Sequence, residues 1–435
     1  MDDTIFALSS GAPPAAIGVI RISGPDARNA AAALTGPLPE ARTAAFRRIR
    51  DPETGEPLDE CVLVWFPAGK SETGEDIVEL QAHGSRAAIR AIETALAKQP
   101  GLRLAEPGEF TRRAFLNGKT DLARIEGLAD LIHAETAPQR RAAMAMMGGA
   151  LSRRIAEWSQ RLTVLSARVE AVLNFSDEGD VDEDALHAGV ADEMAAIAAE
   201  LSADLARPSA ERLKDGIRVV IAGPPNAGKS TLLNALVGRD AAIVSPIAGT
   251  TRDVIEVPVA IGGVPFLLAD TAGLREAGSD MIEAIGIARA AEMLEAADVI
   301  LWLGAPGDAP DVSGERMVVR TKADLAAPPP GAEPTAMIGL SVSALTGQGM
   351  NMLVEALLQA AGRLLPRPGD YALSARQRTA MARAHEALAD GALLGDDVLV
   401  AEALRVALAA LDEITGRAAT EAMLDELFSG FCIGK

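Results

Sequence analysis

The sequence is short of residue types that several functional classes require. It has 435 residues but only two cysteines, too few for a disulfide framework or a four-thiolate zinc site. Aromatic residues make up 3% of the chain, with a single tyrosine, which leaves little material for a base-stacking surface. No run approaches the ~18 apolar residues of a membrane helix, and the acidic N-terminus lacks the basic region of a secretory signal.

Basic charge is scarce as well. The 41 Lys and Arg residues face 61 Asp and Glu, which gives a formal net charge of −20. Because phosphate neutralisation needs clustered basic residues, this composition excludes a general nucleic-acid coat protein. Hydrophobic residues make up 49% of the chain, enough for several cores. We therefore predict a cytoplasmic protein of about two to four domains, with no membrane partner.

Changes in residue pattern divide the chain into three parts. Residues 1–118 mix β-rich and helical runs, which predicts an α+β domain. Residues 119–213 and 371–435 are rich in Ala, Leu, Arg and Glu at helical spacing, which predicts one discontinuous helical domain. Residues 214–370, a Pro-rich linker included, alternate apolar strands with helices. This alternation predicts an inserted α/β domain with a mostly parallel, doubly wound sheet.

Individual elements are also predicted from these patterns. The expected strands are residues 17–22, 61–66, 76–80, 217–222, 266–270, 299–304 and 316–321. A helix is expected at 86–98, and an acidic, solvated connector at 176–185 interrupts the helical part.

A phosphate-binding motif opens the inserted domain. Residues 223–230 read GPPNAGKS and fit G-x-x-x-x-G-K-[ST], between a predicted strand and a helix at 231–237. Backbone N–H groups of such a loop surround the β-phosphate, Lys229 bridges the β- and γ-phosphates, and Ser230 binds Mg²⁺. The residues expected to contact nucleotide here are Asn226, Ala227, Gly228, Lys229, Ser230 and Thr231.

Further motifs follow in the order found in GTPases. The sequence DTAG at 270–273 ends a strand, where Asp270 supports the Mg²⁺ shell, and Thr251 in the preceding GTTRD completes that shell. Asp324 in TKAD accepts from the N1–H and N2–H of guanine, a donor pair that adenine lacks. The nucleotide-contacting residues expected here are Asp270, Thr271, Ala272, Gly273, Thr321, Lys322, Asp324, Ser343, Ala344 and Leu345.

Two positions depart from the usual GTPase pattern. Thr321 stands where the guanine motif has Asn, and we expect its hydroxyl to tie this loop to the phosphate loop while guanine specificity is kept. Leu274 follows DTAG in place of the Gln that orients the attacking water in Ras-like proteins. The catalytic water therefore needs another residue to orient it.

Signatures at both ends of the chain identify a family. They are GVIRISG at 18–24, VELQAHG at 78–84, PGEFT at 107–111 with NGK at 117–119, and the tail FCIGK at 431–435. With the GTPase motifs, they make the whole chain closely resemble the bacterial tRNA modification GTPase family MnmE (TrmE).

The resemblance implies a homodimer with a folate site. N-terminal domains of the family pair and bind 5-formyltetrahydrofolate, and the matching residues here are Arg21, Glu79, Lys119 and Lys435. Basic side chains suit the carboxylates of the folate tail, and Glu79 suits the N–H edge of the pterin. The alternative for Arg21 and Glu79 is an ordinary ion pair on the strand surface.

The resemblance also implies K⁺-dependent hydrolysis of GTP when two G domains dimerise. The matching K⁺ ligands are Asn226, Ser245, Ile247 and Thr250, and Ser245 stands where the family usually has Thr. Glu283 matches the carboxylate that orients the attacking water. The switch segment that carries Glu283 is one residue longer than the usual form. Cys432 is either a nucleophile or a small buried hydrophobe. The segment that holds the K⁺ ligands Ser245, Ile247 and Thr250 is also expected to contact the nucleotide. The contacts expected there are Ser245, Pro246, Ile247, Ala248, Gly249, Thr250 and Thr251.

The function implied by the family is modification of tRNA at C5 of the wobble uridine. A flavin-dependent partner, MnmG, forms a heterotetramer with the family's dimer, and folate supplies a one-carbon unit. Two alternatives stay open: a ribosome-assembly GTPase, and a folate-dependent one-carbon transferase whose G domain only regulates. The first would need a basic RNA-binding module, whereas residues 371–435 hold more acidic than basic residues.

Overall fold

A computed structural model describes residues 3–175, 189–240, 242–243, 256–270, 290–312, 314–325, 339–367, 370–418, 420–431 and 434. The chain forms two units, one of Met1–Ile125 with Asp412–Lys435 and one of Glu126–Leu411.

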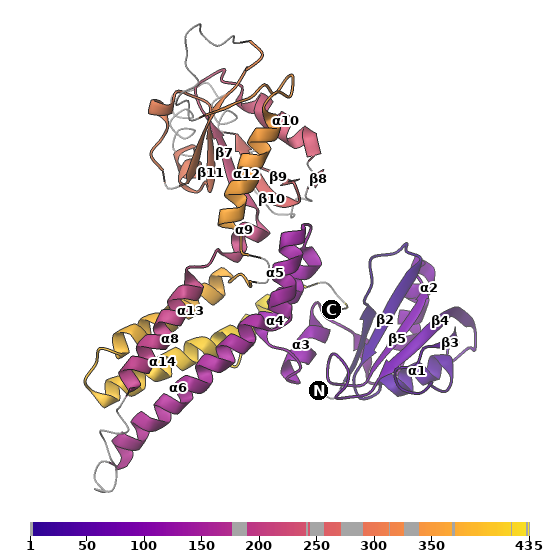
Figure 1. The fold of residues 1–435 in the computed structure, drawn as a ribbon. Coiled ribbons are helices and arrows are strands. Elements are labelled where there is room, and N and C mark those ends of the chain that lie inside the picture. The colour runs from indigo at the N-terminus through magenta and orange to yellow at the C-terminus, as the bar shows by residue number, and fades with distance from the viewer. Residues whose placement is uncertain are drawn as a thin grey trace, which may run out of the picture. The chain divides into compact units, whose positions relative to one another are not determined.

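A six-stranded sheet is the centre of the first unit (Figure 1, indigo). Its order is β3-β4-β5-β2-β1-β6, antiparallel except for the parallel pair β1–β6. The strands are β1 (Thr4–Leu8), β2 (Ile17–Ser23), β3 (Ala45–Arg50), β4 (Pro57–Phe66), β5 (Ile77–His83) and β6 (Leu102–Leu104). The helices that lie wholly in this unit are α1 (Ala27–Thr35), α2 (Arg86–Ala97), α3 (Glu109–Leu116) and α15 (Glu421–Ser429).

Alternation along the strands builds the core of this unit. Ile20 and Ile22 of β2 and Leu80 of β5 are completely buried on one face of the sheet, together with apolar residues of α1 and α2. Ser85 starts α2 because its side chain accepts a hydrogen bond from Ala88 N. The opposite face carries Arg21 and its neighbours.

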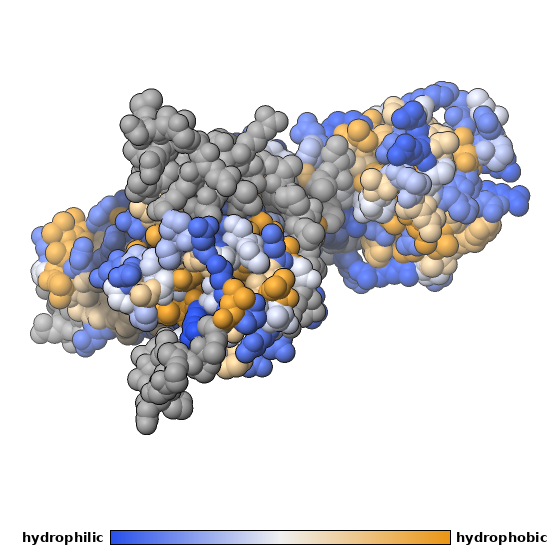
Figure 2. All heavy atoms as spheres, turned by 90° about the horizontal axis from the view of Figure 1, so that it is seen from above, coloured by the Kyte–Doolittle hydropathy of each residue, from blue (hydrophilic) through white to orange (hydrophobic). Residues whose placement is uncertain are grey.

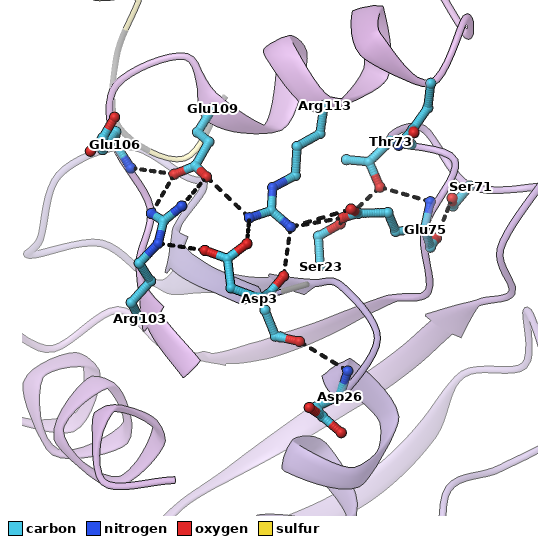
Figure 3. Close-up of polar contacts among 12 residues, drawn as sticks. Asp3, Ser23, Asp26, Ser71, Thr73, Glu75, Arg103, Glu106, Glu109 and Arg113 are labelled. Atoms are coloured by element: carbon cyan, nitrogen blue, oxygen red, sulfur yellow. Dashed lines mark hydrogen bonds and ion pairs between the residues drawn. The ribbon is translucent and has the colours of Figure 1, made fainter. Parts of the chain in front are cut away.

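A completely buried arginine joins α3 to the strands and loops beside it. The Arg113 guanidinium forms ion pairs with Asp3 (2.8 Å), Glu109 (3.1 Å) and Glu75 (3.2 Å), as Figure 3 shows. Ser23 Oγ donates to Glu75 Oε2 at 2.8 Å. A buried cation is tolerated only when carboxylates surround it, and this cluster meets that requirement.

Helices make up one part of the second unit. The helix α8 packs along α13, and Trp158 of α6 is buried with its Nε1–H donated to Glu200 of α8 at 2.9 Å. The helices are α5 (Ala137–Met147), α6 (Ala150–Phe175), α8 (Val190–Leu205), α9 (Ala210–Lys214) and α13 (Ala375–Gly391). Two more, α4 (Leu122–His133) and α14 (Asp397–Thr415), contain the positions where the chain passes from one unit to the other.

A seven-stranded sheet forms the rest of the second unit. Its order is β13-β12-β11-β7-β10-β9-β8; the strands from β13 to β10 are parallel, and β9 and β8 are antiparallel. Its strands are β7 (Ile217–Ala222), β8 (Ala242–Ile243), β9 (Glu256–Ile261), β10 (Val264–Asp270), β11 (Val299–Trp302), β12 (Glu315–Arg320) and β13 (Leu340–Ser341). The helices α10 (Lys229–Asp240) and α12 (Met350–Leu364) pack on its core, and Pro306–Asp308 is a short 3₁₀ turn.

The predicted fold class is confirmed: an α+β part, a helical part and an inserted, mostly parallel α/β part are all present. The expected strands and the helix at 86–98 are confirmed within a few residues. The sequence did not predict β1, β3, β6, β8 or β9. The connector at 176–185 lies outside the described residues.

None of the described helices is both long and apolar enough to cross a bilayer. On the face seen in Figure 2, hydrophobic residues form several groups, with hydrophilic residues between and around them.

Replacing Arg113 by Met tests the buried cluster. The variant keeps the apolar stem but leaves Asp3, Glu75 and Glu109 facing one another without a cation. We expect a loss of about 3–5 kcal/mol in the free energy of unfolding of this unit, seen by calorimetry as a lower transition temperature. Arg405→Met, which removes an exposed pair with Glu402, should leave the transition unchanged. An unchanged transition in Arg113→Met would contradict the prediction.

The contact between His83 and Asp59 predicts a pH effect on stability. His83 Nδ1 lies 2.7 Å from Asp59 Oδ1, and this hydrogen bond raises the pKa of His83. A raised pKa means that the stabilisation is complete below the ordinary pKa of histidine and is lost as the pH rises through the raised value. We therefore expect wild type to melt at a higher temperature than His83→Gln, and we expect this difference to be larger at about pH 5.5 than at about pH 8.5. Asp59→Asn should abolish the difference; a constant offset would refute the effect.

Candidate functional site

The loop after β7 has the backbone shape of a phosphate cradle. Gly223 (φ 153°), Asn226 (φ 61°) and Gly228 (φ 92°) all have positive φ, so the chain turns tightly before α10 begins at Lys229. A side chain at Gly223 would lie 3.0 Å from Leu303 Cβ, so this turn also requires glycine sterically. The turn and helix start have the form that directs N–H groups at an anion.

Lys229 is buried and folds back over this loop. Its Nζ donates to Gly223 O at 3.1 Å and to Pro224 O at 3.0 Å. The ammonium group is therefore already positioned above the loop, where a phosphate bound to the backbone N–H groups would meet it.

Ser230 and Asp270 come together from neighbouring elements. Asp270 is the register partner of Ile221 on the parallel strand β7, which brings its carboxylate to the edge where α10 begins. Ser230 Oγ donates to Asp270 Oδ2 at 2.5 Å. A hydroxyl and a carboxylate at this spacing are oxygen donors of the kind that Mg²⁺ prefers, so these residues fit that ion.

The loop after β12 is tied to the phosphate loop. Thr321 Oγ1 donates to Ala227 O at 2.6 Å, and Lys322 Nζ donates to Asn226 O at 2.9 Å. The hydrogen bond expected of the Thr321 hydroxyl is therefore present. Asp324, three residues further on, is exposed at this edge.

A second loop supports the first from β13. Ala323 N donates to Val342 O at 3.1 Å, and the buried Ser343 accepts a hydrogen bond from Thr346 N at 3.2 Å. Leu345 is exposed. The loops that carry Asp324 and Ser343 thus lie side by side, as the base-binding loops of a GTPase would.

Several predicted site residues fall outside the described part of the chain. They are Ser245, Pro246, Ile247, Ala248, Gly249, Thr250, Thr251, Thr271, Ala272, Gly273, Glu283, Cys432 and Lys435. Their roles stay predictions. Of the two cysteines, Cys61 is described; its burial in β4 raises the pKa of the thiol to about 12, which makes it a poor nucleophile.

The first unit brings together three of the predicted folate residues with one loop. Arg21 of β2 and Glu79 of β5 are register partners, with Arg21 Nη2 and Glu79 Oε1 3.0 Å apart. Lys119 Nζ donates to Gly69 O at 2.7 Å. The Arg21–Glu79 ion pair is the arrangement that the simpler alternative also expects, so it does not decide between the two interpretations.

Two neighbours of Arg21 were not identified from the sequence. Glu72 Oε2 lies 3.0 Å from Arg21 Nη1, and the ring of Phe110 lies 5.7 Å from Arg21 Cζ. Phe110 belongs to the PGEFT signature, which gave a signal for the segment but not for this contact. No sequence signal pointed to Glu72, because its position depends on how the loop folds.

These features define the class of protein. They form a P-loop domain of the GTPase type. Its parts are a strand, a tight loop with an inward lysine, a paired serine and aspartate, and two further loops placed to bind the base. Comparison with known sequences places the chain more narrowly. A family model described as "MnmE helical domain" matches residues 122–432, and one described as "GTP-binding protein TrmE N-terminus" matches residues 4–119.

Curated relatives match the chain from end to end. The tRNA modification GTPase MnmE of Erythrobacter litoralis is 55% identical over 433 residues, covering 100% of both chains. That of Rhizorhabdus wittichii is 56% identical, covering 100% of this chain and 97% of the relative. That of Zymomonas mobilis is 50% identical, covering 99% of this chain and 100% of the relative. This chain belongs to the MnmE (TrmE) family, and the prediction of a tRNA modification GTPase is confirmed at that level.

Replacing Thr321 by Val tests the tie between the two loops. The variant keeps the shape but removes the donor to Ala227 O. We expect GTP affinity to fall by about three- to tenfold, the effect of one hydrogen bond of ~0.5–1.5 kcal/mol, in equilibrium titration with a fluorescent GTP analogue. Thr94→Val removes a similar hydroxyl from α2, where it donates to Arg90 O, and should change nothing. Equal affinity in the two variants would refute the role of Thr321.

Proposed function

We propose that this chain binds GTP at the edge formed by the phosphate loop and the loops after β12 and β13. Lys229 meets the β- and γ-phosphates, Ser230 and Thr251 hold Mg²⁺, and Asp324 accepts from guanine. The 2.5 Å contact between Ser230 and Asp270 supports the metal assignment. When bound, Mg²⁺ neutralises charge that develops on the phosphates during hydrolysis.

We further propose that hydrolysis requires K⁺ and pairing of two G domains. Asn226, Ser245, Ile247 and Thr250 are the proposed K⁺ ligands, and Glu283 the residue that orients the attacking water. Asn226 supports this assignment, because it lies exposed at the tip of the loop with positive φ while its own carbonyl is held by Lys322. An exposed amide there is accessible to an ion shared with a second copy.

The first unit is proposed to bind 5-formyltetrahydrofolate in a homodimer. Arg21, Lys119 and Lys435 would meet carboxylates of the folate tail, and Glu79 would hold the Arg21 guanidinium in place through their ion pair. The fit rests on two cations held by one loop, Arg21 through Glu72 and Lys119 through Gly69. When bound, the folate supplies a one-carbon unit.

The whole protein is proposed to modify C5 of the tRNA wobble uridine together with the flavin-dependent MnmG. The product carries an aminomethyl or carboxymethylaminomethyl group, and Cys432 is the proposed nucleophile. Dimerisation of the G domains on GTP binding moves the helical part and reorganises the complex. The observation that carries this proposal is the 55% identity over the whole chain to a tRNA modification GTPase, combined with the phosphate-loop geometry.

Hydrolysis of GTP in K⁺ against Na⁺ tests the proposal. With the purified full-length chain, the rate should be ~10-fold or more higher in K⁺, because a cation takes the part of an arginine finger. The rate per molecule should also rise with protein concentration in K⁺ alone, since the active form is a dimer. Equal rates in both salts would indicate an ordinary switch GTPase.

Analysis of tRNA nucleosides separates the remaining alternatives. In cells that lack the native protein, the wild-type chain should restore the modified wobble uridine, and Lys229→Ala should fail to restore it. A folate-dependent transferase with a regulatory G domain would keep its chemistry in Lys229→Ala. A ribosome-assembly GTPase would restore the modified wobble uridine in neither strain, whether the cells carry the wild-type chain or Lys229→Ala.

A further inference from the structure

Arg21 shares its guanidinium between two carboxylates that differ in exposure. Nε and Nη2 donate to Glu79 Oε1 at 3.2 and 3.0 Å, while Nη1 donates to Glu72 Oε2 at 3.0 Å. The Glu79 side chain is 19% exposed and that of Glu72 is 58% exposed. An exposed ion pair is screened by solvent and salt and contributes little. The contact with Glu72 is therefore the one that an incoming anion can replace.

The backbone on both sides of Glu72 is held in place. Thr73 is buried, and its hydroxyl lies 2.8 Å from Ser23 Oγ. Ser71 Oγ donates to Glu75 O at 2.5 Å, and Glu75 in turn pairs with the buried arginine cluster (Figure 3). Releasing Arg21 therefore needs only a rotation of the Glu72 side chain, with no refolding of the loop.

The same loop also contacts the second cation of the proposed site. Lys119 Nζ donates to Gly69 O at 2.7 Å, and a side chain at Gly74 would lie 3.1 Å from Lys119 Cε. A carbonyl oxygen is neutral, so this contact does not cancel the charge of Lys119. The carboxylate of Glu72 does cancel that of Arg21, and this difference makes Glu72 the residue that opposes anion binding.

We propose that Glu72 is an internal carboxylate that occupies Nη1 of Arg21 until the carboxylate of a folate tail replaces it. The inference rests on the proposed function of this site. Glu79 keeps its two hydrogen bonds throughout and positions the guanidinium. Glu72 thereby lowers the affinity for folate and favours ligands whose carboxylate can displace it.

Replacing Glu72 by Gln in the full-length chain tests the exchange. Calorimetric titration should show affinity for 5-formyltetrahydrofolate rising about three- to fivefold, the size expected for one exposed ion pair. A tetrahydropterin without the benzoyl-glutamate tail should bind wild type and variant equally. The matched control is Glu60→Gln, which removes the same charge from the exposed Arg48–Glu60 pair and should not raise affinity.

A second measurement does not depend on folate. Phenylglyoxal modification of Arg21, mapped by mass spectrometry, should be several-fold faster in Glu72→Gln than in wild type or Glu60→Gln, because Nη1 is then no longer paired with a carboxylate. Equal modification rates overturn the inference whether or not folate binds. Absence of folate binding to wild type, with faster labelling in the variant, overturns the proposed folate function while the contact between Glu72 and Arg21 stands.

Discussion

The register between β7 and its parallel neighbours is the constraint on which the nucleotide site depends. Asp270 lies opposite Ile221, and Trp302 of β11 lies opposite Ala222, so these strands end at the same level as the phosphate loop. Parallel strands place their carboxyl ends at one edge, and the loops that follow them must meet there. A slip of one residue in β10 would turn Asp270 to the other face of the sheet and separate it from Ser230.

In the first unit a buried charge has the corresponding role. Arg113 has no exposed surface and gathers carboxylates from the N-terminus, from α3 and from the loop that carries Glu75. Because an unpaired cation could not remain buried, these segments are confined to one arrangement. The position of Glu72 against Arg21 follows from that arrangement, three residues from Glu75. A cluster with no contact to the proposed ligand thus fixes the loop that would meet it.

How far the sequence predicted each feature depends on whether a local pattern encodes it. The strand that ends at Ala222 was predicted because it is a continuous apolar run, and Lys229 and Ser230 because their motif has fixed spacing. The strand Glu256–Ile261 was missed, since it pairs antiparallel on the outer side of β10 and is only partly buried. The burial of Arg113 was also missed: charged residues in a helix normally indicate a solvated face, and only the tertiary contacts show otherwise.

Both proposed ligand sites hold their cations on protein oxygens before a ligand arrives. Lys229 donates to carbonyl oxygens of its own loop, and Lys119 to the carbonyl of Gly69. At Lys119 this contact fixes the position of the ammonium group without cancelling its charge, so an anion is still attracted. Arg21 differs because its outer contact is a carboxylate, which does cancel charge. A ligand at Arg21 must therefore displace a competitor as well as bind, and selectivity at this site arises from that competition rather than from attraction alone.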